Sequence, residues 1–141
     1  MKQNSYELFK NGSMDEILGS LEESLSKSDE APIWRDRVIP FSKAILSVLI
    51  PLRDHHLLFD PQMVGVEVLT PELFFEWSDF VSLKNLLFIV AQSKEYDFVD
   101  IEELGRYLSQ NGVDLQNERL DFPIATYNLH QGVSSVIKSL L

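Results

Sequence analysis

The chain of 141 residues contains no cysteine. Disulfide bonds, thiolate metal sites and cysteine nucleophiles are therefore excluded. Glycine is also sparse, and no glycine lies in a phosphate-binding sequence of the GxxxxGK(S/T) or GxGxxG type. The GxSxG sequence of a hydrolase nucleophile elbow is missing as well. The chain thus lacks the usual sequence signs of nucleotide binding and of nucleophilic catalysis, and we expect neither an enzymatic activity nor a cofactor.

Basic residues are few. Lysine and arginine total 12 against 22 aspartate and glutamate residues, which gives a formal net charge of -10. Because nucleic-acid affinity comes mainly from contacts between cationic side chains and phosphates, this charge disfavours direct nucleic-acid binding. A protein partner that carries basic residues is the better match.

The three histidines do not form a metal-binding pattern. His55 and His56 are adjacent, and neighbouring residues do not share a helix face. His130 stands alone in its segment. With cysteine also absent, we expect no metal site and interpret the histidines as polar loop residues.

The longest hydrophobic run, Ile39 to Leu52, is too short to cross a bilayer. A membrane-spanning helix needs about 20 apolar residues, and this run is interrupted by Ser42, Lys43 and Ser47. Apolar residues recur here at steps of three and four, which predicts a buried central helix near 34–53. The residues in this pattern are Trp34, Val38, Phe41, Ile45, Val48, Leu49 and Leu52.

The rest of the sequence is also helical in pattern. Ser13 and Glu16 form a capping box, so a helix is expected over about 14–26. Thr70 and Pro71 mark a second clear helix start. Further helices are expected over about 83–93, from Asp100 to Asn111-Gly112, and after Pro123, whereas residues 54–69 are predicted to be a connector.

Together these patterns predict an all-α fold, a compact bundle of about six helices. The length of the chain suits one domain. We expect residues 1–12 to be an N-terminal connecting segment and residues 13–141 to be a single helical domain.

The helix that starts at Pro71 carries a candidate partner-binding surface. Opposite its apolar face the sequence places Glu72, Phe75, Glu76 and Asp79, three acidic residues around one aromatic side chain. An apolar anchor surrounded by charge is typical of a docking site, here for a basic amphipathic or disordered peptide. The alternative is a solvated acidic face with Phe75 covered by a neighbouring helix.

Several short motifs follow one another along the chain: Gly12-Ser13, the acidic Asp29-Glu30, Trp34 to Arg37 and Leu52-Arg53-Asp54. In this order they resemble the all-alpha domain of type IV secretion system coupling proteins, in the branch of Dot/Icm systems and related conjugative plasmids. In that branch a Gly-Ser precedes the first helix, and an acidic linker leads to a Trp-x-x-Arg helix start and a Leu-Arg-Asp helix end. Residues 59–73 and 127–141 are similar to the later segments, so the resemblance covers most of residues 5–141, whereas Val38 and Pro40 depart from the family pattern.

The resemblance implies a function in secretion or conjugation. Parent proteins of this family are hexameric ATPases anchored in the bacterial inner membrane, and their all-alpha domain is an insertion at the cytoplasmic mouth of the channel. By this resemblance the chain is a substrate-recognition module, excised from the ATPase, that binds secreted effectors, relaxosome proteins or adaptors without touching the membrane. Two alternatives stay open: a DNA-contacting regulatory domain of the same coupling protein, and a stand-alone helical adaptor protein.

Overall fold

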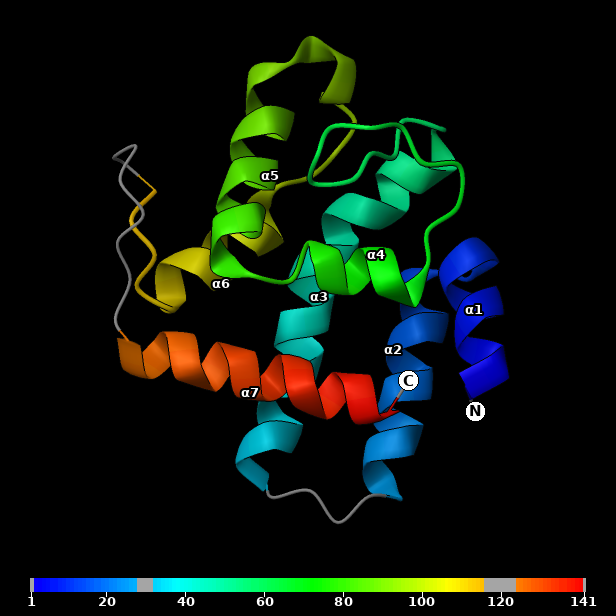
Figure 1. Cartoon of the computed structure of the whole chain (residues 1–141), viewed down its shortest axis with the longest axis vertical. Helices are drawn as coiled ribbons and strands as arrows, with labels where there is room; N and C mark the ends of the chain where they lie inside the picture. Colours follow the sequence, from blue (N-terminus) through cyan, green and yellow to red (C-terminus); the bar gives the residue numbers. More distant parts are fainter. Residues whose placement is uncertain (1, 28–31, 116–123, 141) are drawn as a thin grey trace.

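The computed structural model describes residues 2–27, 32–115 and 124–140, and within them the predicted all-helical bundle is confirmed. Figure 1 shows the arrangement of the helices. The described residues form seven α-helices and one short 3-10 helix, η1. In chain order these are α1 Lys2–Asn11, α2 Met14–Ser26, α3 Pro32–Asp54, α4 Pro71–Glu76, α5 Phe80–Gln92, η1 Lys94–Tyr96, α6 Glu102–Gln110 and α7 Ile124–Leu140.

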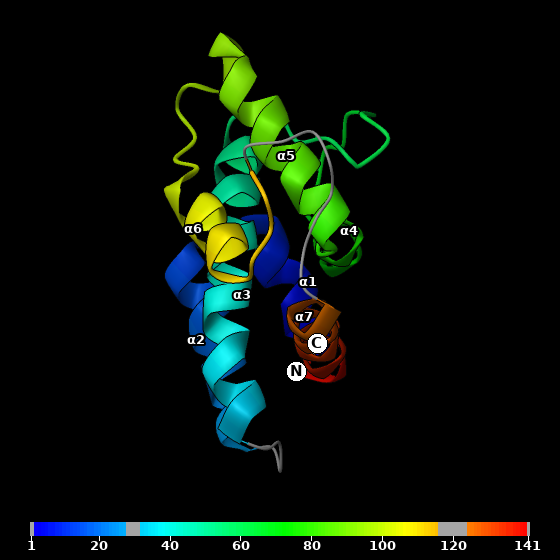
Figure 2. The ribbon, with the colours of Figure 1, turned by 90° about the vertical axis from the view of Figure 1, so that its left-hand side faces the viewer.

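Helix α3 is the centre of the bundle, as the hydrophobic pattern predicts. It packs against α2, α4, α6 and α7, and in Figures 1 and 2 it runs as a long rod with α2 alongside and α7 crossing it. Its predicted apolar residues from Val38 to Leu52 are fully buried, while the side chain of Trp34 lies outside the described residues. None of the helices in the described part of the chain is both long and apolar enough to cross a membrane.

Two prolines lie inside α3. Helix α3 begins at Pro32, two residues before the expected position at 34. Pro40 therefore falls in the helix interior, where it has no N–H to donate to the carbonyl of Asp36. Pro40 is exposed, so this interruption of the helical ladder faces the surface rather than the core.

The N-terminal segment that we expected to be a connection contains helix α1. Its Phe9 side chain is buried and packs edge-on against Phe74 of α4, with ring centroids 5.6 Å apart. Gly12 ends the helix with its amide donating to the carbonyl of Leu8, and a Cβ at Gly12 would stand only 2.6 Å from that oxygen. Only glycine fits so close to the backbone.

The capping box of α2 is confirmed. The Glu16 amide donates to Ser13 Oγ at 3.1 Å, and the Ser13 amide donates back to the Glu16 carboxylate at 3.2 Å. Because Gly12 and Ser13 are adjacent, α1 stops and α2 starts within two residues. The two helices are thereby fixed at a sharp corner.

The predicted helix from Pro71 is short. Thr70 caps α4 as expected, but the helix ends at Glu76, and the Asp79 carboxylate accepts from the Val81 amide to begin α5. Helix α5 therefore starts three residues before the expected position at 83. Trp77, between the two helices, is buried, and its indole N–H donates to the carbonyl of Phe59 at 3.0 Å.

The connector over 54–69 is irregular, with a single isolated bridge between Phe59 and Gly65. Helix α6 ends as predicted, since Gly112 has a left-handed φ of 78°. Pro123 lies outside the described residues, but α7 is present from Ile124. In both ribbon views the start of α1 and the end of α7 lie side by side (Figures 1 and 2).

Candidate functional site

Of the four residues predicted to form a docking surface, three lie on α4 and the fourth, Asp79, begins α5. Glu72 and Glu76 are exposed, and Phe75 is half-buried against Phe74, with ring centroids 5.2 Å apart. The ammonium group of Lys138, from the end of α7, lies 5.3 Å from the centre of the Phe75 ring. Phe75 is thus neither fully covered nor free.

Asp79 has a different task from the other three predicted residues. Its carboxylate caps α5 and also accepts from the hydroxyl of Ser82 at 3.2 Å. Its oxygens are therefore already used within the chain, and Asp79 contributes charge rather than a free acceptor.

Helix α1 adds a residue that the sequence did not point to. Tyr6 is 49% exposed, and hydrogen bonding and charge from the neighbouring Glu72 carboxylate raise the pKa of Tyr6. No pattern in residues 1–12 placed this tyrosine beside α4. We use the name α4 surface for the residues Tyr6, Glu72, Phe75, Glu76 and Lys138.

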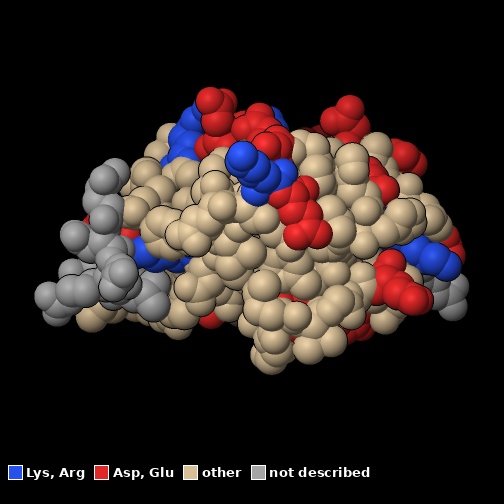
Figure 3. All heavy atoms as spheres, turned by 90° about the horizontal axis from the view of Figure 1, so that it is seen from above, with Lys and Arg blue, Asp and Glu red and all other residues tan. Residues whose placement is uncertain are grey.

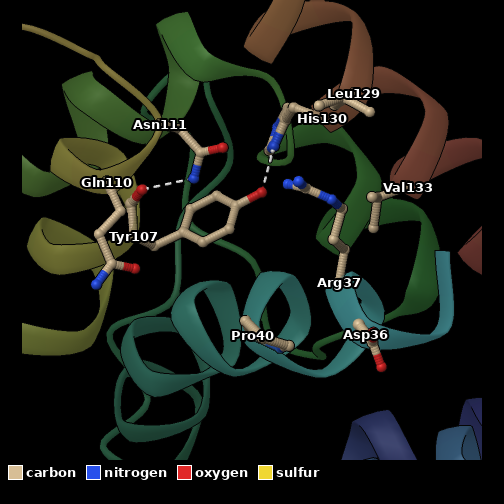
Figure 4. A pocket seen from close by; sticks show the side chains of 9 residues that line it. All are labelled: Asp36, Arg37, Pro40, Tyr107, Gln110, Asn111, Leu129, His130 and Val133. Atoms are coloured by element: carbon tan, nitrogen blue, oxygen red, sulfur yellow. Dashed lines mark hydrogen bonds between the residues drawn. The ribbon is translucent and has the colours of Figure 1, made fainter. Parts of the chain in front are cut away.

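A second site is a pocket of about 420 Å³ between α3, α6 and α7 (Figure 4). Its lining mixes charged, amide and apolar side chains. Helix α3 supplies Asp36, Arg37 and Pro40, α6 and its end supply Tyr107, Gln110 and Asn111, and α7 supplies Leu129, His130 and Val133.

His130 forms the floor of this pocket and is only 1% exposed. The Tyr107 hydroxyl lies 2.7 Å from Nδ1, and Nε2 is hydrogen-bonded to the carbonyl of Ser78. A carbonyl can only accept, so Nε2 carries the hydrogen and Nδ1 accepts from Tyr107. The imidazole ring is stacked on Phe80 and tilted against Phe41, with centroids 4.1 and 4.7 Å away.

Both members of the Tyr107–His130 pair are neutral at neutral pH. Burial lowers the pKa of His130 to about 4 and raises the pKa of Tyr107 above its usual value. A general base works best with a pKa near the working pH, and neither group meets that condition. The pair links α6, α7 and the turn before α5, and it suits a structural role better than proton transfer.

The interpretation of His130 as a polar loop residue is wrong. The residue lies within α7, in the core, and shares one face with Val133, Ser134 and Ile137, which are also buried. This spacing of three, four and seven is a helical stripe, and it was visible in the sequence. The prediction missed this stripe because it counted histidine as a polar residue only.

Arg37 points into the pocket from α3. Its guanidinium group lies beside the Tyr107 hydroxyl, near enough to act on the tyrosine electrostatically, whereas Asp36 points away from both (Figure 4). No hydrogen bond or ion pair between the described residues uses Arg37. An arginine with five donors thus stands at the pocket without a carboxylate partner from the described chain.

Arg53, in contrast, is buried and fully engaged. Nη1 donates to the carbonyl of Phe9 at 2.9 Å, and Nε and Nη2 pair with Asp54 at 3.0 and 2.9 Å. Phe9 lies in the last turn of α1, where backbone carbonyls lack helical donors. The end of α3, Leu52-Arg53-Asp54, therefore holds the last turn of α1, which is followed by Gly12-Ser13. Two of the sequence motifs named above thus lie close together in the structure.

The described residues offer no metal centre. No group of three or more potential His, Cys, Asp or Glu ligands comes together in the described ranges. His55 instead stacks on Phe98, with ring centroids 3.7 Å apart. On the face shown in Figure 3, Lys and Arg appear as separate groups, most of them beside acidic side chains, and they do not merge into a basic patch.

Comparison of the chain with family models, with curated proteins and with solved structures finds no match.

Proposed function

We propose that this chain is a partner-recognition module of a type IV secretion coupling protein, and that it binds protein substrates or adaptors without catalysing a reaction. The proposal rests on the ordered motifs described above for the sequence. The α4 surface supports it as the place of binding: it holds a half-exposed aromatic ring next to two exposed glutamates and a tyrosine. Aromatic residues of this kind anchor protein interfaces, and the surrounding charge selects the partner.

The position of the chain ends agrees with the same proposal. The start of α1 and the end of α7 lie side by side (Figure 1), and a domain inserted into another must enter and leave its host at neighbouring points. DNA sequence on both sides of this reading frame tests the insertion. We expect the Walker A and Walker B segments of an ATPase to flank it, and a frame with unrelated neighbours would contradict the coupling-protein assignment.

Binding at the α4 surface is tested with peptides of opposite charge. A 20-residue amphipathic peptide of lysine and leucine should shift the backbone amide signals of residues 72–76, and 0.5 M salt should weaken the effect. The matched peptide with glutamate in place of lysine should leave these signals unchanged. Equal shifts with both peptides would show unspecific adhesion and contradict the proposal.

Two variants sharpen this experiment. The change F75A/E72K/E76K removes the anchor and reverses the charge while it spares Asp79, whose loss would damage the start of α5. It should weaken binding of the lysine peptide by at least about tenfold. The control E22K/D97K reverses two exposed charges elsewhere, and its affinity should stay within about twofold of the wild type. An equal loss in both variants would point to net charge alone.

A further inference from the structure

We propose that the pocket between α3, α6 and α7 binds a carboxylate group of the partner protein, with Arg37 as its ligand. The inference deepens the proposed function and rests on it for the identity of the partner. It does not concern the α4 surface, which needs a basic partner segment.

Arg37 has no polar partner among the described residues. The described residues give its guanidinium no hydrogen bond and no ion pair, although the chain carries 22 acidic residues against 12 basic ones. Lys43 and Arg106, the neighbouring cations on α3 and α6, both pair with Glu103. Arg37 is thus the cation near this pocket that the described chain leaves available.

The polar groups beside Arg37 are fixed by contacts of their own. The Tyr107 hydroxyl gives its hydrogen to His130, and His130 is fixed by Ser78 and by the rings around it. Neither of these two polar groups beside Arg37 is anionic, so neither can balance its positive charge. Both are uncharged at neutral pH, since burial lowers the pKa of His130 to about 4 and raises that of Tyr107. The positive charge of Arg37 is therefore available to an anionic group of a binding partner.

The shape of the guanidinium group and the pocket lining favour a carboxylate as the ligand. One planar guanidinium matches one planar carboxylate through two parallel hydrogen bonds. Phosphate usually recruits several cations or helix amides, whereas among the described lining residues the other charged one is the anionic Asp36. Pro40, Leu129 and Val133 add apolar walls, which suit the aliphatic part of a leucine or glutamate residue. A volume of about 420 Å³ has room for such a residue.

The carboxylate has two sources in a protein, the chain end and the acidic side chain, and small probes separate them. N-acetylleucine presents a terminal carboxylate, N-acetylglutamic acid α-amide presents a side-chain carboxylate, and N-acetylleucinamide presents neither. Each is titrated into the isotope-labelled chain, and backbone amide signals are followed at residues 36–40, 107–111 and 129–133. We expect saturable shifts with at least one carboxylate probe. The probe that binds with the higher affinity shows whether the pocket prefers a terminal or a side-chain carboxylate.

Variants assign the effect to Arg37. R37Q should weaken binding of the carboxylate probe by at least about tenfold, and R37K, which keeps the charge but loses the planar fork, should weaken it less. D36N should bind as tightly as the wild type or more tightly, because a nearby negative charge is removed. R106Q changes an exposed arginine on α6 that pairs with Glu103 and should leave the affinity unchanged. Melting temperatures within a few degrees of the wild type establish that R37Q is folded.

Three results would overturn the inference: shifts of equal size with N-acetylleucinamide, tighter binding of inorganic phosphate than of either carboxylate probe, or unchanged affinity in R37Q. The probes do not touch the α4 surface. Saturable binding that depends on Arg37 therefore stands even if the lysine peptide fails to bind, and failure of the probes leaves the proposed function to its own test.

Discussion

At the scale of single residues, buried polar side chains join the helices through specific hydrogen bonds. His130 is held neutral among aromatic rings, and each of its ring nitrogens has a defined partner, Tyr107 or Ser78. Leaving either partner unsatisfied inside the protein costs about 1–3 kcal/mol. The imidazole ring therefore links α6, α7 and the turn before α5 through hydrogen bonds. Because its pKa is lowered in the folded protein, it also makes the free energy of unfolding depend on pH.

We predict that stability falls as the pH drops below about 6.5. The pKa of His130 is about 4 in the folded protein and about 6.5 in the unfolded chain. Between these values the unfolded state binds more protons, so the free energy of unfolding decreases toward pH 4, by up to about 1.4 kcal/mol per pH unit.

Urea unfolding between pH 7.5 and 4.5 measures this dependence, and H130Q should have a shallower slope than the wild type. The ring signals of His130 in a nuclear magnetic resonance titration give an independent check. A midpoint near pH 6.5 in the folded protein would contradict the buried neutral state.

At the scale of elements, the helix ends explain the arrangement better than the helices themselves. Ser13, Thr70 and Asp79 each accept a backbone amide at a helix start, and Gly12 lets α1 stop directly before α2. At the other end of α1, Arg53 of α3 satisfies the carbonyl of Phe9. Side-chain contacts at these ends therefore fix how the N-terminal helices meet the central one.

Replacing Arg53 should loosen α1 from α3. R53A leaves the Phe9 carbonyl without its donor in a buried place, and we expect the free energy of unfolding to fall by about 2 kcal/mol. R53K keeps the charge but cannot reach Phe9 and Asp54 together, so an intermediate loss is expected.

The matched control is R106A, because Arg106 is exposed and its ion pair with Glu103 is at the surface. Its cost should stay below about 0.5 kcal/mol. Chemical denaturation compares the variants, and amide exchange reports whether α1 is the part that opens in R53A. An equal loss of unfolding free energy in R53A and R106A would contradict the role of Arg53 in holding α1 against α3.

At the scale of the whole molecule, we expect the net charge to favour basic protein partners over nucleic acids. The net charge is -10, and on the face in Figure 3 the cations form separate groups, most of them beside acidic side chains. We expect such a surface to repel a phosphate backbone and to attract basic protein segments. The exposed glutamates of the α4 surface fit this picture, while Arg37 in its pocket is a local exception suited to one anionic group.

DNA binding is the corresponding test. With a 30-base-pair duplex at 50 mM salt, we expect no shifted band at protein concentrations up to about 100 µM, because nonspecific DNA binding depends on several cation contacts to phosphates. A complex that forms at low salt and dissolves at high salt would instead favour a DNA-contacting regulatory domain.

The sequence by itself determined the helical class, the central helix and most helix starts. These follow from local rules: a capping residue bonds within three positions, and a helical stripe needs only the spacing of its own residues. The buried run near 34–53 and the Ser13–Glu16 box were predictable for that reason. The missed helix α1 has a mean hydropathy too low to stand out, and packing of Phe9 on α4 stabilises it.

Only the tertiary structure decided the sites. Arg37, Tyr107 and His130 come from three helices separated by long stretches of chain, and no local pattern says that their side chains meet. Likewise Tyr6 joins Glu72 only because α1 packs on α4. The partners of a buried polar group depend on how helices cross, and that is set by the summed packing of the core rather than by neighbouring residues.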